Sequence, residues 1–227
     1  MRLRARGIAC HFGGVRALDG VDLDVEEGTC LAVVGGNGSG KSTLLDVLSG
    51  LRRPDRGTVE IDDHRPAWTP GAFARCGMRR TFQEPRLVPD LGVDANIALG
   101  LSGRLPSALG IPFSRRSREA NEVARARAAV GLDLPGRWPA AKTSYGQRKR
   151  IELARVLVAN PSVALLDEPL AGVAVDDRPR LLDGIRALAR AGTAVVLVEH
   201  DRAAVASVAS EVLDLGGSAG RAPRRPS

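Results

Sequence analysis

VVGGNGSGKST, residues 33 to 43, is the stretch that predicts the fold of this 227-residue chain. An apolar run, Cys30 to Val34, leads into it and is typical of a buried strand. The last glycine of the stretch is followed by Lys41 and Ser42, which is the spacing of a phosphate-binding P-loop between a strand and a helix. Glycines let the backbone turn its N–H groups inward around an anion, and the helix adds the positive end of its dipole. We therefore predict a nucleotide phosphate site made of Gly35, Gly36, Asn37, Gly38, Ser39, Gly40, Lys41, Ser42 and Thr43.

The alternative reading of this stretch is a surface loop rich in Gly and Ser. With ordinary residue frequencies, the full pattern arises by chance well under about once in a hundred chains of this length, and the flanking strand and helix lower that figure further. Nucleotide binding is therefore the stronger interpretation. In it, Lys41 reaches the outer phosphates and the Ser42 hydroxyl is a ligand of Mg²⁺.

Composition sets broad limits on the class of protein. With 44% apolar and 26% charged residues, the chain suits one large α/β domain, or one domain that carries a small insert. No apolar run approaches the roughly 18 residues that cross a bilayer, and no signal-peptide core follows the N-terminus. The three cysteines, Cys10, Cys30 and Cys76, are far apart, so we expect a reducing cytosol and neither a disulfide framework nor a zinc site.

The formal net charge of +7 comes almost wholly from arginine. Nucleic acid, an acidic membrane surface and a solvated basic face are the three readings of such a charge. Only 3% of the residues are aromatic, and the basic clusters have no interleaved aromatics, so base stacking has little support. We expect a solvated basic face first, membrane proximity second, and no nucleic acid partner.

Hydrophobic periodicity predicts alternating strands and helices along most of the chain. Residues 62 to 80 show no clear pattern, and residues 93 to about 158 are helical and basic, with interruptions at 103 to 114 and 134 to 136. Within that insert, Ser117 is predicted to cap a helix that runs to Val130, and a polar turn, Thr143 to Gln147, precedes another helix. The predicted strands are 3 to 12, 21 to 25, 30 to 34, 58 to 61, 163 to 169, 194 to 198 and 211 to 215, and further helices are predicted at 41 to about 51 and 178 to 191.

Acidic and basic side chains follow two of the buried strands. Asp167 and Glu168 follow the buried apolar run that begins at Val163. Downstream of a P-loop, the first acid of such a pair holds Mg²⁺ through its water shell, and the second polarises the attacking water. An exposed acidic strand end is the alternative. His200 follows the strand at 194 to 198; a lone histidine there is usually structural, but the carboxyl ends of parallel strands are where open α/β sheets place their active groups.

Two further candidates are individually weak. Phe12, next to a Gly-Gly turn, could stack on an adenine ring, although an isolated Phe near a strand end is more often part of the core. Gln83 lies at a predicted strand end, where a lone glutamine is ordinarily only the polar terminus of the strand.

Taken in order, five motifs of this chain resemble those of the ATP-binding subunit of an ABC transporter, over about residues 3 to 215. They are the P-loop, Gln83, the Ser144-to-Gln147 motif, Asp167-Glu168 and Glu199-His200-Asp201. The resemblance implies an α/β fold: a P-loop NTPase core with a parallel sheet, an N-terminal antiparallel β subdomain, and a helical signature-motif subdomain. It further implies a single ABC ATPase domain over 1 to 227, with the helical subdomain inserted at about 90 to 158 and an unpacked tail at 216 to 227.

The resemblance also implies roles for single residues. Phe12 would be the adenine platform, and Gln83 would link Mg²⁺ and the attacking water to the transporter contact. Ser144, Gly146 and Gln147 would be signature residues that contact the γ-phosphate held by the P-loop of a second ATPase subunit, with His200 contacting that phosphate from the P-loop side. Two ATP molecules would then be sandwiched in a head-to-tail homodimer or heterodimer.

Finer detail is similar to the importer ATPases for branched-chain amino acids and related amides, notably residues 12 to 18, Arg80 to Gln83, and Tyr145. Two departures are Ala174, where the family usually has Asp or Asn, and a chain that stops soon after residue 215. The alternatives are the ATPase of an ABC transporter with another substrate or direction, a soluble non-transport ABC ATPase, and a nucleotide sensor without catalysis. We expect ATP and Mg²⁺ as cofactors, permease subunits as partners, and a cytoplasmic location, peripheral on the inner face of the cell membrane.

Overall fold

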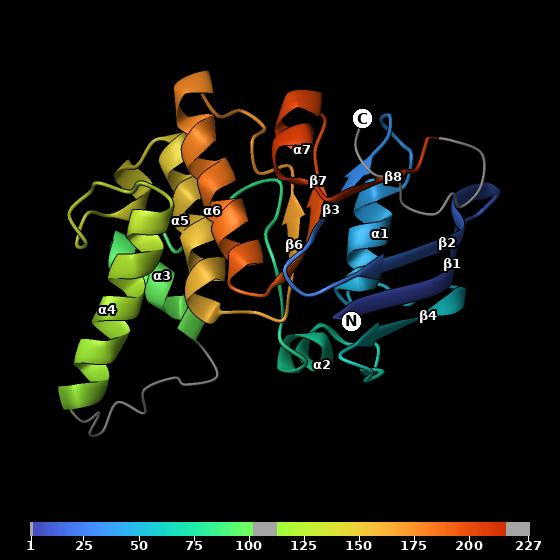
Figure 1. Ribbon diagram of the computed structural model, residues 1–227, viewed down its shortest axis with the longest axis horizontal. Coiled ribbons are helices and arrows are strands. Elements are labelled where there is room, and N and C mark those ends of the chain that lie inside the picture. Colours follow the sequence, from blue (N-terminus) through green and yellow to red (C-terminus); the bar gives the residue numbers. More distant parts are fainter. Residues whose placement is uncertain (1, 102–112, 217–227) are drawn as a thin grey trace. The chain divides into compact units, whose positions relative to one another are not determined.

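The computed structural model describes residues 2–101 and 113–216, which divide into two compact units. Of the described residues, the first unit contains 2–80, 161–169 and 188–216, and the second contains 81–101, 113–160 and 170–187. The α/β fold predicted from the sequence is confirmed, with a parallel sheet, an antiparallel sheet and a helical part (Figure 1). Most of the predicted interruption at 103 to 114, and the predicted tail beyond 216, lie outside the described residues.

An antiparallel sheet of order β2-β1-β4 belongs to the first unit. Its strands are β1 (Leu3–Phe12), β2 (Val15–Val25) and β4 (Arg56–Ile61). The prediction of a strand only from Val21 was wrong, because β2 pairs with β1 as far as Val15, which lies opposite Phe12. The hairpin turn at Gly13-Gly14 brings the two strands back together, and Gly13 has the positive φ, +58°, that such a turn requires.

A parallel sheet of order β5-β6-β7-β3-β8 forms the rest of the first unit's strand structure. Because neighbouring strands of this sheet pair in parallel, they deliver their carboxyl ends to one edge. Two strands, β3 and β7, match the predicted bounds, whereas β5 and the helix α2 (Pro70–Arg75) arise from the stretch that showed no pattern. The strands are β3 (Cys30–Val34), β5 (Met78–Arg80), β6 (Val163–Asp167), β7 (Ala194–Val198) and β8 (Glu211–Asp214).

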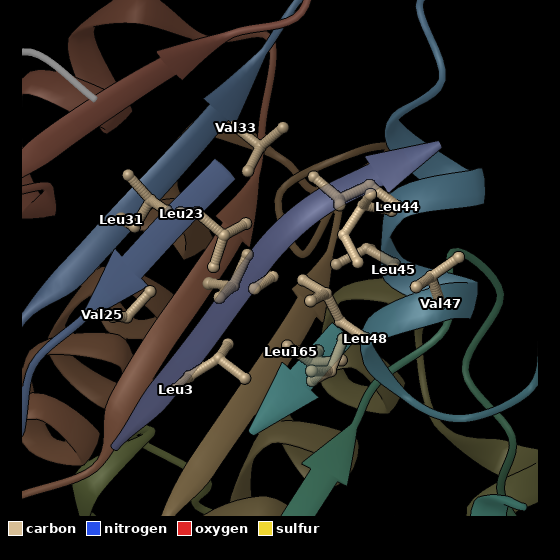
Figure 2. Packing of buried hydrophobic residues seen from close by; sticks show 14 of the residues in the cluster. Leu3, Leu23, Val25, Leu31, Val33, Leu44, Leu45, Val47, Leu48 and Leu165 are labelled. Atoms are coloured by element: carbon tan, nitrogen blue, oxygen red, sulfur yellow. The ribbon is translucent and has the colours of Figure 1, made fainter. Parts of the chain in front are cut away.

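The core of the first unit lies between α1 (Lys41–Leu48) and both sheets. Figure 2 shows leucines of α1 meeting side chains of β1, β2, β3 and β6 in one apolar cluster. The helix ends at Leu48 rather than at the predicted Leu51, because Gly50 takes a left-handed conformation, φ +71°, and leaves no room for a Cβ beside Phe73. The P-loop helix is thus anchored in the core from its second turn onward.

The second unit is helical. Its α5 (Tyr145–Ala159) packs against α3 (Val93–Ala98) and α4 (Phe113–Ala129), and buries Ile151 and Ala154 completely. The remaining elements are the short helices η1 (Leu99–Leu101), η2 (Ala140–Lys142) and η3 (Val175–Asp177), and most of α6 (Arg178–Arg190). Among the described helices, none has the length and apolar character needed to cross a bilayer.

Two helix starts in the second unit differ from the predictions. Ser117 is not a cap, because α4 begins four residues earlier, at Phe113; neither Gly nor Pro occurs in residues 113–116 to stop it. The segment Tyr145 to Gln147 is the first turn of α5 rather than a polar turn before it. Ser144 caps this helix: its Oγ accepts from Gln147 N at 3.2 Å, and Gln147 Oε1 accepts from Ser144 N at 2.8 Å, the reciprocal pair of a capping box.

Candidate active site

The P-loop owes its shape to glycine. Gly40 is the N-cap of α1 with φ +94°, and a Cβ there would run into the carbonyl of Ala17 and lie 2.9 Å from Leu18 Cδ2. A Cβ on Gly35 would lie 2.5 Å from Ser39 Oγ. No side chain caps the start of α1, so its first backbone N–H groups keep their capacity to bind an anion.

Lys41 lies folded across this loop. Its Nζ donates to the carbonyl oxygens of Gly35 at 2.9 Å and Gly36 at 2.8 Å, and the residue is only 7% exposed. Among the residues that the structure describes, no carboxylate pairs with this ammonium. The Ser39 hydroxyl nearby is buried and has no hydrogen-bond partner within the same described part of the chain. A bound phosphate would supply both the counter-charge for this buried cation and a hydrogen-bond partner for the unsatisfied hydroxyl.

Three strand ends meet beside the loop. Val198 of β7 lies opposite both Val33 of β3 and Asp167 of β6, so the residues that follow these strands emerge together at one sheet edge. Glu168 follows β6 with a positive φ of +45°, a strained conformation for a residue with a side chain. Its Oε1 lies 3.1 Å from His200 Nε2. The structure therefore brings the P-loop, the acidic pair and the histidine of the sequence analysis into one unit.

His200 is itself held by the chain around it. The Glu199 carboxylate accepts from the His200 backbone N–H at 3.0 Å, and Asp201 caps the helix α7 (Arg202–Val208) by accepting from Ala203 N and Ala204 N. Neither α7 nor this cap was predicted from the sequence. An Asp directly before an Ala/Val-rich segment was the signal that could have found them.

Phe12, the proposed adenine platform, belongs to the same unit and is 42% exposed at the end of β1. The guanidinium of Arg52 lies over its ring, 4.4 Å from the centroid. Such an exposed ring can offer a face to another planar group. Its contact with adenine stays a prediction.

Gln83 lies in the second unit, where α5 holds its segment. Its backbone carbonyl accepts from Tyr145 Oη at 3.3 Å and from Lys149 Nζ at 2.5 Å. One turn further along α5, Glu152 Oε1 accepts from the backbone N–H of Arg86 at 3.3 Å. The helix that begins with the Ser144 cap thus fixes the backbone around Gln83, while the roles assigned to Gln83, Ser144, Gly146 and Gln147 stay predictions.

The loop with Ala174 also contacts α5. Ala174 directly precedes η3, and Asp177 at the end of η3 pairs with Arg150 Nη2 at 3.3 Å. A Cβ on Gly146 would lie 3.1 Å from Asp177 Oδ2, so this carboxylate is close to the first turn of α5. Ala174 has no polar side-chain atom, and Asp177 is engaged within its own unit.

Glu152 predicts a pH dependence of stability. Burial raises its pKa from 4.5 to about 6, and the residue is 5% exposed. Between these two values the unfolded chain loses the proton first, so the free energy of unfolding should fall as pH rises, by about 2 kcal/mol in total. Glu152→Gln keeps an acceptor for Arg86 but cannot titrate, so urea unfolding across this pH range should show a correspondingly smaller fall. An unchanged pH profile in this variant would contradict the assignment.

The chain is similar to ATP-binding proteins of ABC transporters. A family model described as "ABC transporter" matches residues 18–171. The aliphatic sulfonates import ATP-binding protein SsuB 2 of Xanthomonas axonopodis is 41% identical over 94% of this chain and 67% of its own length. The branched-chain amino acid transport ATP-binding protein BraF of Pseudomonas aeruginosa is 32% identical over 99% and 91%. The arabinose import ATP-binding protein AraG of Burkholderia pseudomallei is 39% identical over 87% of this chain, which spans only 39% of that relative.

Solved structures agree with these matches. An ATP-binding cassette of an ABC transporter has a TM-score of 0.78 at 28% identity, covering 94% of this chain and 87% of that one. A dimeric bacterial ABC transporter cassette has a TM-score of 0.83 and covers 99% of both chains at 21% identity, which shows a shared fold.

Proposed function

Because this chain belongs to the ABC transporter family, as one of its ATP-binding ATPase domains, we propose that it is the energy-coupling subunit of an importer. The observation that supports ATP as its ligand most directly is the buried Lys41 ammonium, which contacts P-loop carbonyls and no carboxylate in the described part of the chain. A triphosphate on the loop supplies the missing negative charge. Lys41 then exchanges carbonyl contacts for phosphate oxygens.

In the proposed hydrolysis, Glu168 accepts a proton from the water that attacks the γ-phosphorus. A new P–O bond forms to that water, and the bond to the ADP oxygen breaks with its electron pair on ADP. His200 Nε2, 3.1 Å from Glu168 Oε1, would orient that carboxylate and, as the resemblance to the family implies, would contact the transferred phosphate. The unusual backbone conformation of Glu168 is consistent with a residue held in place for function.

The oxygen donors of the site suit Mg²⁺. Hydroxyl and carboxylate oxygens are the ligands that this hard cation prefers, and Ser42 at the start of α1 and Asp167 at the end of β6 supply one of each. When bound, Mg²⁺ neutralises charge on the phosphate oxygens. Ser42 and Asp167 would hold it, and the resemblance to the family implies Gln83 as a further ligand.

The proposal includes the partners. A second ATPase subunit would face this one head to tail and place its own Ser144, Gly146 and Gln147 on the nucleotide held here. Permease subunits would bind at the inner face of the cell membrane, where this chain would be peripheral. The support for these statements is the family, the import proteins among the relatives, and the dimeric cassette of similar fold.

For the substrate we propose branched-chain amino acids or related small amides. BraF and this chain match along almost their whole lengths, whereas the sugar import relative is matched over 39% of its length. The Arg80-to-Gln83 segment and Tyr145 support the same group. The identities to sulfonate and arabinose import proteins make those substrates the alternatives to be tested.

An uptake experiment tests this function. Deleting the gene in its source organism should abolish high-affinity uptake of labelled leucine, isoleucine or valine, and leave uptake of arabinose and aliphatic sulfonates intact. Wild-type chain should restore uptake, and Glu168→Gln, produced at the same level, should not. Loss of sugar or sulfonate uptake instead would show the substrate to be wrong, and unchanged uptake of all three would exclude each of these substrates.

A further inference from the structure

Arg80, the last residue of β5, places a buried guanidinium between two carboxylates. Its side chain is 8% exposed. One nitrogen, Nη1, donates to Asp46 Oδ1 at 2.7 Å and to Ser49 Oγ at 3.0 Å, and the other, Nη2, donates to Asp167 Oδ2 at 3.3 Å. The arginine therefore links β5 to the P-loop helix α1 on one side and to the end of β6 on the other.

Both elements joined by Arg80 carry an oxygen donor for the proposed Mg²⁺. On α1, Asp46 lies four residues after Ser42, so the two side chains share one face of the helix. On β6, the contacted residue is Asp167 itself. A single side chain thus ties the face of α1 that carries Ser42 to the carboxylate at the end of β6.

The electrostatics require such a link. Asp46 and Asp167 both contact one guanidinium, so without its charge the two carboxylates would repel each other. Contact with Oδ2 also restrains the rotation of the Asp167 carboxylate about its last torsion.

We propose that Arg80 is a positioning residue for Mg²⁺: it orients Asp167 relative to Ser42 before the cation arrives. This rests on the proposed function, in which ATP and Mg²⁺ bind at the P-loop edge. Arg80 acts through Asp167 and does not itself hold the cation. Outer contacts of this kind orient a ligand and change metal affinity without changing the set of ligands.

The geometry explains why the residue is arginine. Two separate nitrogens of a rigid planar fork reach two carboxylates on different elements. A lysine at this position keeps the charge but has a single ammonium, which cannot span both partners in the same way. Arg80→Lys therefore removes the positioning and keeps the charge.

The test measures the effect of Mg²⁺ on nucleotide binding in the absence of turnover. A fluorescent ATP analogue is bound first in EDTA and then during a Mg²⁺ titration. Arg80→Lys should raise the Mg²⁺ concentration at half-maximal effect by about tenfold or more, and change the affinity in EDTA less than about twofold. Arg79→Lys is the matched control, because Arg79 donates to the carbonyls of Ala74 and Met78 and should leave the Mg²⁺ titration unchanged.

A second variant keeps the test decisive if Arg80→Lys does not fold, as judged by circular dichroism and thermal unfolding. Asp46→Asn leaves Arg80 in place but weakens its attachment to α1, and should shift the Mg²⁺ titration in the same direction by a smaller factor. Unchanged titrations in the folded variants, or an equal shift in Arg79→Lys, would overturn the role of Arg80. Wild-type chain that binds no ATP analogue, or binds it without regard to Mg²⁺, would instead overturn the proposed function.

Discussion

Lys41→Ala should lower the affinity of the chain for ATP by about 100-fold or more. A hydrogen bond to a charged group contributes about 1.5–3 kcal/mol, and the ammonium can make two of them to phosphate oxygens. Lys41 also ties the carbonyls of Gly35 and Gly36 together when no nucleotide is bound, so its loss removes an internal brace of the loop as well. Both effects act in the same direction, because a looser loop has more entropy to lose on binding.

Equilibrium titration with a fluorescent ATP analogue measures this effect. Lys142→Ala is the control: it deletes the same charge from an exposed position and should leave the affinity unchanged. An affinity of Lys41→Ala within about twofold of the wild-type value would show that the ammonium does not contact the phosphates.

Glu168→Gln should slow ATP hydrolysis by on the order of 10²- to 10⁴-fold, the usual contribution of a general base. Glutamine has the same size and can still hydrogen-bond His200, but its amide cannot take a proton from water. ATP should bind with nearly unchanged affinity, because the substitution leaves the P-loop intact. Bound ATP that is not hydrolysed should then accumulate a dimer.

Phosphate release and light scattering test both parts of this prediction. Glu211→Gln, an exposed glutamate at the start of β8, is the matched control and should hydrolyse ATP at the wild-type rate. Wild-type chain should be mainly monomeric without nucleotide, since much of the proposed dimer contact is made through ATP. Equal hydrolysis rates for Glu168→Gln and the wild type would rule out the assignment of Glu168 as the base.

The elements that could be predicted are those with a strong local signal. Cys30–Val34 and Ala194–Val198 are short buried apolar runs, and their predicted bounds agree with the structure. By contrast, β5 has three residues and no periodicity, and α1 was drawn too long because the close approach of Gly50 to Phe73 is a tertiary contact. Ser117 was misplaced for a related reason: a good capping residue is also tolerated inside a helix when nothing before it stops the helix.

By itself, the sequence determined the phosphate-binding loop and the acidic pair at the end of β6, because both depend on residue types at adjacent positions, and the loop depends also on the turn that glycine permits. Only the tertiary structure decided which distant side chains meet there. Glu168 and His200 are 32 positions apart, and Arg80 joins Asp46 and Asp167 across 34 and 87 positions. The physical reason is the strand order β5-β6-β7-β3-β8, which differs from the order along the chain and brings these strand ends to one edge.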